Sequence, residues 1–304
     1  MIKYTVPVAI LLVVSCTKGS NTQIPKPGRT VSDSLLVYQV NGTNGNGAIF
    51  SKNFTKGDSN LLVSNATMPY VASQRMVYIK SGKTLGYSKL NGISRFLFEL
   101  NEPSDPCLSI DARLICVVDK TIDEYQLLVM DTLGSKTTLY HSSFEIKQPE
   151  FSTDGVSIFF SQKTETGNFT IYKINSGGGT PMQLIAPVTG INYTDCAATA
   201  DRLYFLQSRT VSGKFSTEIC SVNLSGSDFQ KNSDFTVNWS QPGFVMQDLR
   251  KINSSTLIFI SEYGSTNKEI FLAKVDNLSF HSRITYTDNY ESHPNLVPAF
   301  VKDF

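Results

Sequence analysis

The chain of 304 residues is long enough for two average domains, although an all-β propeller or barrel of this size often forms a single unit. Apolar residues make up 40% of it, which suffices for a buried core, and 27 Lys and Arg nearly balance 26 Asp and Glu. Because there is no basic excess to neutralise phosphates, we expect no nucleic acid partner.

The first fifteen residues have the pattern of a secretory signal peptide. Lys3 precedes an apolar run from Val6 to Val14, which is shorter than the about 20 residues needed to span a bilayer. The run ends in a Val-Val-Ser-Cys sequence that resembles a bacterial lipobox. That resemblance implies cleavage before Cys16 and acylation of its thiol and amine, which would anchor the protein to a membrane. The alternative is an ordinary signal peptide with an incidental cysteine.

The segment that follows is predicted to be a flexible tether. Residues 16–31 are polar, include two prolines and show no periodicity. We therefore divide the chain into a signal peptide at 1–15, the lipidated Cys16 with its tether at 16–31, and one folded domain at 32–304.

A short motif, proline followed two residues later by an apolar residue, recurs through the folded part. Its copies are 37 to 52 residues apart, which is typical of a four-stranded propeller blade. The copies contain Pro69, Pro106, Pro149, Asp195 in place of a proline, Pro242 and Pro294. Each copy is predicted to form the strand nearest the axis of a propeller.

Three further strands are predicted for each unit, from apolar and β-branched runs bounded by turn residues. The first three units contain Leu35–Val40, Ala48–Phe50 and Leu61–Val63; Met76–Ile79, Tyr87–Leu90 and Phe96–Leu100; and Leu114–Val118, Leu127–Met130 and Thr137–Tyr140. The last three contain Ser157–Phe160, Ile171–Ile174 and Gln183–Ile185; Leu203–Leu206, Ile219–Val222 and Phe229–Phe235; and Leu257–Ile260, Ile270–Val275 and Arg283–Tyr286.

These strands form complete blades in only one way. The first unit, at Leu35, lacks a proline-motif strand, and the last motif, at Pro294, has no strands after it. Joining the two completes a sixth blade and leaves no open sheet edge. No segment shows helical spacing of apolar residues. The sequence therefore predicts an all-β, six-bladed propeller with four antiparallel strands per blade, closed by its C-terminal strand.

The best-preserved unit starts at Gln148 and includes Pro149, Phe151 and the Asp154-Gly155 pair. It resembles the WD-like repeat of TolB-type propellers, with Thr153 in place of that repeat's second proline. In this repeat the Asp-Gly pair turns the chain between the first two strands.

The resemblance covers residues 33–300 and is partial outside the best unit, where only Asp111 keeps the aspartate. It implies the fold, whereas one fold hosts many functions. TolB has a further N-terminal domain with no counterpart in this sequence, so its partners are not carried over.

No catalytic constellation is found. The three histidines, His141, His281 and His293, lack metal-ligand or catalytic spacing and are expected at the surface or in loops. There is no nucleophile elbow, metal-ligand pattern or cofactor motif. We therefore expect neither a metal nor a cofactor.

Carboxylates on or near the innermost strands are candidate contacts for a cation or polar ligand, because propellers usually bind ligands in a funnel at one end of the channel. They are Asp105, Glu150, Asp154, Asp195, Asp248 and Glu291. The alternative is turn-forming aspartates and solvated charge at the rim.

Cys107 and Cys116 are predicted to lie opposite each other across a tight turn at Asp111-Ala112. Directly opposed residues of antiparallel strands lie within disulfide range, and disulfides persist in exported proteins. We predict a bridge here, with two buried free thiols as the alternative. Cys196 and Cys220 are expected to stay unpaired.

The leading functional hypothesis is a non-enzymatic binding or scaffold module for an envelope protein or a cell-wall glycan. The alternatives are a carbohydrate-active lyase or hydrolase with its site in the funnel, and an envelope spacer that binds nothing. Thr17 is not the aspartate that retains lipoproteins at the inner membrane. We therefore expect lipid anchoring at the outer membrane, facing the periplasm.

Overall fold

The computed structural model describes residues 34–41, 47–53, 57–90, 94–231, 245–262, 268–276, 278, 281–286 and 291–297. The predicted signal peptide, Cys16 and the tether lie outside this part of the chain. Within it every regular element is a strand. No helix among these residues is long and apolar enough to cross a membrane.

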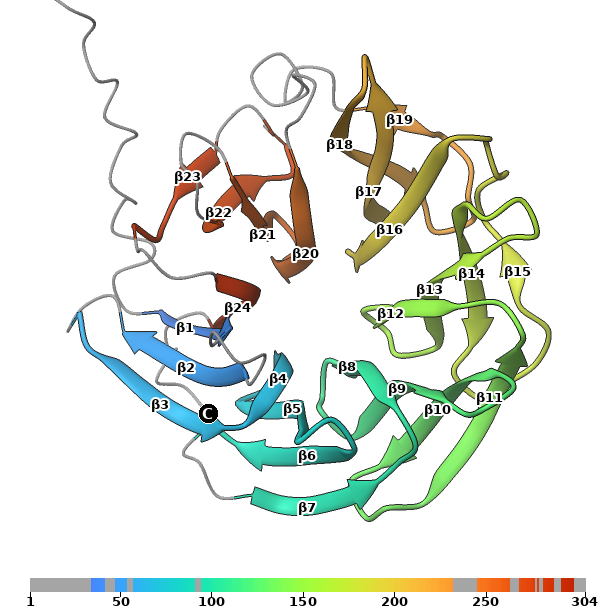
Figure 1. Cartoon of the computed structure of the whole chain (residues 1–304). Coiled ribbons are helices and arrows are strands. Elements are labelled where there is room, and N and C mark those ends of the chain that lie inside the picture. Colours follow the sequence, from blue (N-terminus) through green and yellow to red (C-terminus); the bar gives the residue numbers. More distant parts are fainter. Residues whose placement is uncertain are drawn as a thin grey trace, which may run out of the picture.

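Twenty-four strands form six four-stranded antiparallel sheets around a central axis (Figure 1). Blade A consists of β24 (Glu291–Val297), β1 (Leu35–Asn41), β2 (Gly47–Asn53) and β3 (Ser59–Ser64). Blade B consists of β4 (Ala66–Ala72), β5 (Arg75–Lys80), β6 (Thr84–Lys89) and β7 (Ser94–Glu99). Blade C consists of β8 (Pro103–Leu108), β9 (Leu114–Lys120), β10 (Tyr125–Asp131) and β11 (Lys136–Ser142). Blade D consists of β12 (Ile146–Phe151), β13 (Ser157–Lys163), β14 (Phe169–Asn175) and β15 (Met182–Gln183). Blade E consists of β16 (Ile191–Ala198), β17 (Arg202–Val211), β18 (Lys214–Asn223) and β19 (Gln230–Lys231). Blade F consists of β20 (Met246–Asn253), β21 (Thr256–Ser261), β22 (Glu269–Lys274) and β23 (His281–Arg283).

The ring closes where the sequence predicts. The C-terminal strand β24 pairs antiparallel with β1, with Leu35 opposite Val297 and Val40 opposite Glu291. Figure 1 shows β24 as the innermost strand of the blade that β1 to β3 complete. The closure holds both ends of the described chain in one sheet, so that β1 has a partner strand on each side and its blade has four strands like the other five.

Apolar side chains pack between neighbouring blades, and successive residues of one strand face opposite neighbours. In β13, Phe159 joins a cluster with Phe205 of blade E, whereas Phe160 joins Val117 of blade C. All four side chains are fully buried. Because both faces of each blade are covered, its middle strands contain runs of consecutive apolar residues, as in other sheets buried on both sides. Each such side chain contributes about 1.5–3 kcal/mol by leaving water.

The turns from first to second strand repeat one hydrogen-bond pattern in blades C, D and E. The hydroxyl of Ser152 donates to Asp154 and accepts from the Ser157 amide. Ser109 with Asp111 and Thr199 with Asp201 do the same. The predicted role of the Asp154 turn is confirmed. Asp201 was not recognised as a third copy, although it stands five residues after Cys196, as Asp154 does after Pro149.

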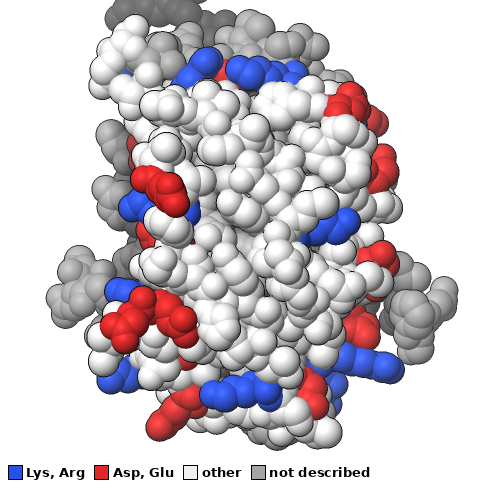
Figure 2. All heavy atoms as spheres, turned by 90° about the vertical axis from the view of Figure 1, so that its right-hand side faces the viewer, with Lys and Arg blue, Asp and Glu red and all other residues white. Residues whose placement is uncertain are grey.

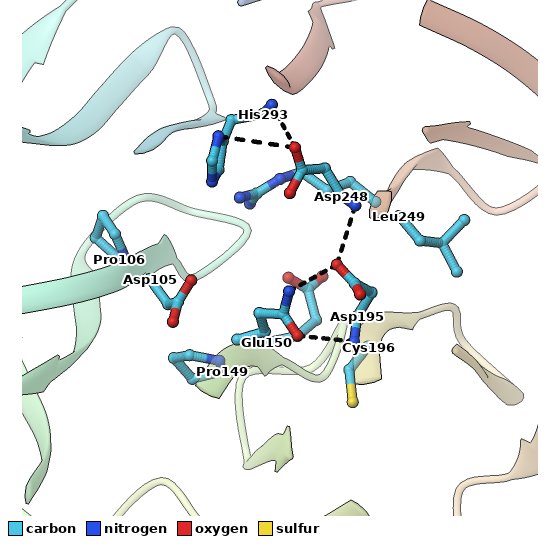
Figure 3. Close-up of a pocket in the computed structure, with 11 residues that line it drawn as sticks. Asp105, Pro106, Pro149, Glu150, Asp195, Cys196, Asp248, Leu249 and His293 are labelled. Atoms are coloured by element: carbon cyan, nitrogen blue, oxygen red, sulfur yellow. Dashed lines mark hydrogen bonds and ion pairs between the residues drawn. The ribbon is translucent and has the colours of Figure 1, made fainter. Parts of the chain in front are cut away.

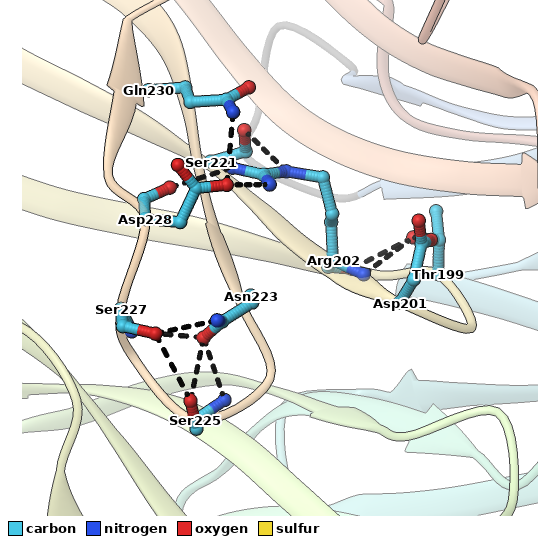
Figure 4. Close-up of polar contacts among 9 residues, drawn as sticks. All are labelled: Thr199, Asp201, Arg202, Ser221, Asn223, Ser225, Ser227, Asp228 and Gln230. Carbon is cyan, nitrogen blue, oxygen red and sulfur yellow. Dashed lines mark hydrogen bonds and ion pairs between the residues drawn. The ribbon is translucent and has the colours of Figure 1, made fainter.

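The outer hairpins are closed by an Asn or Asp at the end of the third strand. In blade E the side-chain oxygen of Asn223 accepts hydrogen bonds from the amides of Ser225 and Ser227 (Figure 4). Asp131 and Asn175 cap the equivalent turns in blades C and D. These side-chain oxygens are used to stabilise the turns, which leaves few of them to bind a ligand.

An ion pair beside this hairpin also stabilises the local chain path. Arg202 on β17 contacts Asp228 at 2.6 Å, and Asp228 also accepts from the Gln230 amide group (Figure 4). The pair ties the end of β17 to the chain leading into the short β19. The polar cluster in Figure 4 is therefore part of the fold.

The structure corrects the predicted phase of two repeats. In β16 the residue at the proline position is Cys196, one residue later than predicted, and Asp195 precedes it. The predicted copy at Pro242 lies outside the described residues, and the innermost strand of blade F is β20, whose equivalent position is Leu249. Two of the six units thus lack the proline, so the proline spacing was a misleading guide there.

The outer strands of blades D and F are shorter than, or shifted from, the predicted runs. Leu184 and Ile185, predicted as strand, lie beyond β15 and are buried in the interface with blade E. Figure 2 views the molecule from the right-hand side of Figure 1, where blades D and E lie. Charges of both signs lie mainly along the margins of this face, with no extended patch of one sign.

Candidate functional site

Six residues with a left-handed backbone, one from each blade, surround the central channel. They are Met68, Asp105, Gln148, Asp195, Asp248 and His293, with φ between 49° and 56°. We call them the channel ring. Each lies at a shift in register between the innermost strand and the next, which is a β-bulge. Bulges re-aim side chains, and here they direct five polar side chains and one methionine towards the axis.

The chemistry of the ring residues fits this backbone. Left-handed φ is uncommon for residues other than glycine, and Asp and His are among those that tolerate it best. Each such residue costs on the order of 1–3 kcal/mol. The cost has to be offset by contacts that hold the bulge in place.

Those contacts run from blade to blade. The amide of Asp195 donates to Gln148 Oε1 at 3.0 Å, the amide of Asp248 to Asp195 Oδ1 at 3.0 Å, and the amide of His293 to Asp248 Oδ2 at 2.8 Å. Each bulge thus presents its N–H to the side chain of the ring residue in the preceding blade.

The same arrangement continues on the other side. The Gln148 amide donates to the Asp105 carboxylate, and the Asp105 amide lies 3.3 Å from Met68 Sδ. The amide of Met68 donates to Gln39 Oε1 of β1, so blade A is connected as well. The ring side chains therefore link all six blades, which is a structural role for most of the acidic residues at the axis.

Burial changes the acidity of the ring. Removal from water, followed by the negative charge of Asp248, raises the pKa of Asp195 to about 7. The hydrogen bond from the Thr194 hydroxyl and the positive charge of Arg250 lower the pKa of Asp195. Burial also raises the pKa of Asp105, against the effect of His293. Asp195 and Asp105 thus retain protons more readily than exposed aspartates do.

Glu150 connects the ring to the next layer of the channel. Its side chain is buried, and burial raises its pKa against the opposing effects of Lys251 and Tyr70. Tyr70 donates to Glu150 Oε2 at 2.8 Å, and the Lys251 ammonium lies 3.6 Å from Oε1. Arg250 stacks on the Tyr70 ring at 4.7 Å. Glu150 and Arg250 line a small cavity at the ring, and Tyr70 and Lys251 line a second cavity next to it.

The space enclosed by the ring is small. Asp105, Asp195, Asp248, His293 and Glu150 converge on it (Figure 3), and about 20 Å³ is open to the centre of a water-sized sphere. That is room for about one water molecule. Among the residues that the structure describes, no group of three His, Cys, Asp or Glu side chains is placed to hold a metal ion.

A wider cavity, which we call the funnel, opens on the other side of the Glu150 layer. Its volume is about 420 Å³ on the same measure, and all six innermost strands or their turns line it. Tyr70, Lys251 and Asn295 form its floor, since they lie only two or three residues beyond the ring. Its walls include Ile110, Phe151 and other apolar side chains, with serine and threonine at the mouth.

The funnel contains almost no ionisable groups. Of the side chains that line it, only those of Tyr70 and Lys251 titrate, and no carboxylate is among them. The larger of these two cavities and the cluster of carboxylates are therefore at different places along the channel.

The predicted carboxylates divide accordingly. Asp105, Glu150, Asp195 and Asp248 are brought together at the small cavity. Asp154 is exposed in its turn, and Glu291 is buried in β24 without lining either cavity. Whether any of the six binds a ligand stays a prediction.

Sequence reasoning also missed two members of the site. His293 was expected at the surface, but its side chain is only 18% exposed and lies 3.7 Å from Asp248. Gln148 was not considered as a site residue. Both immediately precede the motif proline, and this position in each repeat was the signal that could have found them.

The two cysteines take the predicted register. Cys107 lies directly opposite Cys116 on β9. Both are buried and unbridged in the structure. A disulfide between them stays a prediction. Burial raises the pKa of the Cys107 thiol, which disfavours the thiolate needed for exchange. Cys196 and Cys220 are free as well.

No known protein-family model matches the sequence, and no curated protein is similar to it in sequence. Solved structures do share its architecture. TolB from Acinetobacter baumannii superposes with a TM-score of 0.69 at 13% identity, over 91% of this chain and 69% of that protein. The fold is that of a TolB-like propeller.

Enzymes also share the TolB-like architecture. An oligogalacturonate lyase, solved in complex with manganese, superposes with a TM-score of 0.57 at 12% identity, over 85% of this chain and 76% of the lyase. An acylaminoacyl peptidase from Pyrococcus horikoshii gives 0.55 at 13% identity, over 84% of this chain and 44% of the peptidase. At such identities the likeness establishes the fold alone.

Proposed function

We propose that this TolB-like propeller is a non-enzymatic binding module of a bacterial cell envelope, and that its funnel receives part of a partner protein. The observation that carries the proposal is that the larger cavity and the cluster of carboxylates lie at different places along the channel. A cavity of about 420 Å³ is lined by apolar and hydroxyl side chains, and the carboxylates lie behind it around about 20 Å³.

This separation favours binding over glycoside hydrolysis. Glycoside hydrolysis commonly needs two carboxylates on either side of the scissile bond, about 5–10 Å apart. The funnel could admit a sugar but has no carboxylate on its walls, and the ring has carboxylates but no room for a sugar. Binding pockets, by contrast, are mostly apolar with a few placed polar groups.

A protein partner is favoured over a glycan by the rim. Ile110 lines the funnel and is 56% exposed, and Val156, in the equivalent turn of the next blade, is 52% exposed. The hairpin after β10 adds Leu133, which is 81% exposed on the same side of the blades. Exposed apolar side chains around an apolar cavity are typical of protein contact surfaces.

Site-specific cross-linking tests this proposal. A photo-reactive amino acid placed at Ile110 or Ala200, both at the funnel, should give a discrete adduct with one partner in intact cells. The control is Ile122, which is 99% exposed in the β9–β10 hairpin at the opposite end of the blade. Adducts from Ile122 but from neither funnel position would contradict the proposal.

The membrane anchor is part of the same proposal. Lipidation of Cys16 would tether the propeller to the outer membrane on the periplasmic side, so that the funnel meets envelope partners. We expect Cys16→Ser to move the protein from the membrane fraction to the soluble fraction of the periplasm. The mass of the mature N-terminus measures acylation directly, and an unmodified cysteine in the wild-type protein would refute the anchor.

A further inference from the structure

We infer that the group reaching the floor of the funnel is a carboxylate, supplied by the C-terminal end of a partner polypeptide with an apolar last side chain. The inference rests on the proposed function and names the ligand chemistry of the same site. It starts from Lys251, which is the one cationic side chain among the residues that line the funnel.

The Lys251 ammonium is incompletely satisfied. Its side chain is 15% exposed, and within the described residues its contact is Glu150 Oε1 at 3.6 Å. Charge-assisted hydrogen bonds between ammonium and carboxylate are about 2.7–2.9 Å long. An ammonium has three N–H donors, so Lys251 keeps donors for an anion arriving from the funnel.

Its internal partner is poorly suited to neutralise it. Glu150 is buried, accepts a hydrogen bond from the Tyr70 hydroxyl and also lies near Arg250. Burial raises the pKa of Glu150, and its carboxyl group is shared with Tyr70 and Arg250, so it compensates the charge of Lys251 only in part. Because the funnel walls carry no acidic group, a ligand carboxylate restores the balance without meeting like charge on those walls.

The walls define the rest of the ligand. Leu108, Phe151, Ile252 and Leu296 provide apolar surface above Lys251, which suits an aliphatic or aromatic side chain. At the mouth, Ser73, Thr153 and Ser254 offer hydrogen-bonding groups for backbone amides. An acyl chain has no use for these groups, so a peptide end fits better than a fatty acid.

Two peptides that differ only in their C-terminal group test whether the ligand needs a carboxylate. We expect N-acetyl-Leu-Phe with a free carboxylate to bind about tenfold or more tightly than its C-terminal amide, because a hydrogen bond to a charged group is lost in the amide. Binding is followed by methyl chemical shifts of Ile110, Ile252 and Leu296, with octanoate as the test of an acyl ligand.

Two substitutions should act in opposite directions. Lys251→Met should abolish the preference for the acid, whereas Glu150→Gln should increase affinity for the acid, since it removes the competing internal carboxylate. Lys136→Met, on an outer strand away from the funnel, is the matched control and should change nothing. A merely structural role of Lys251 and Glu150 would not produce opposite signs, and circular dichroism confirms that each variant is folded.

The outcomes separate the two proposals. Equal binding of acid and amide, or shifts with neither probe, overturns the carboxylate inference, while the funnel cross-links decide the proposed function independently. Octanoate binding more tightly than the peptide acid overturns the peptide source. Loss of funnel cross-links together with absent probe binding refutes both.

Discussion

The channel ring and the funnel are built from the same six strands, only a few residues apart, yet they differ in almost every property that matters for a site. The ring contains three aspartates and a histidine but encloses about 20 Å³, whereas the funnel encloses about 420 Å³ with two ionisable side chains. In the ring the carboxylates accept amide hydrogen bonds from the next blade. Charged residues at a propeller axis are therefore not by themselves evidence of an active site.

The largest effect should come from removing a ring acceptor. Asp195→Leu leaves the Asp248 amide and the Gln148 side chain without their acceptor in a buried place. We expect a loss of about 3 kcal/mol or more in the free energy of unfolding, measured in urea. Asp123→Leu, in an exposed hairpin, is the control and should stay within about 0.5 kcal/mol. Equal stability of the two variants would mean that the ring does not hold the blades together.

The pH dependence of stability should follow the ring as well. Asp195 has a pKa of about 7 in the folded protein and an ordinary value of 3.8. Between these values the folded protein keeps a proton that the unfolded chain has released, so the free energy of unfolding falls as pH rises from about 4 to about 7.

Asp195→Asn removes this contribution while keeping an oxygen acceptor. We expect its decline in stability over that range to be smaller by on the order of 3 kcal/mol than that of the wild-type protein. Urea titrations at several pH values measure it, with the exposed Asp123→Asn as control. An unchanged slope would show that Asp195 is ionised throughout.

The smallest effect on stability should come from the funnel. Ala200→Trp adds bulk at its mouth, in an exposed turn where no inter-blade hydrogen bond is lost. The free energy of unfolding should change by less than about 0.5 kcal/mol. Cross-links from Ile110 should nevertheless disappear, because the cavity is filled. A strong loss of stability with cross-linking intact would reverse the assignment of roles to the two regions.

Much of the fold followed from local pattern. The middle strands were predicted well because each blade is covered on both faces, so that a strand such as Ser157–Lys163 contains consecutive apolar residues, Ile158 to Phe160. The Asp154 turn was predicted because its geometry depends on residues next to one another. The copies at Pro242 and Asp195 were misplaced because the proline is not required there: neither Cys196 nor Leu249 supplies one.

The sequence predicted only some of the residues at the site. Four of the six candidate carboxylates meet at the axis, but Asp154 and Glu291 do not, and His293 was not expected there. A residue before proline is ordinarily extended, so no local rule predicted the left-handed backbone of Asp105, Gln148 and His293. The bulges exist because neighbouring blades supply acceptors for their amides.

By itself, the sequence determined the number of blades, the strand that closes the ring and the turns between strands, since each depends on periodicity or on neighbouring residues. The tertiary structure alone decided that the acidic side chains bind the blades together and that the open cavity lies beyond them. Those properties arise from contacts between residues about forty or more positions apart, which only the closed ring brings within hydrogen-bond distance.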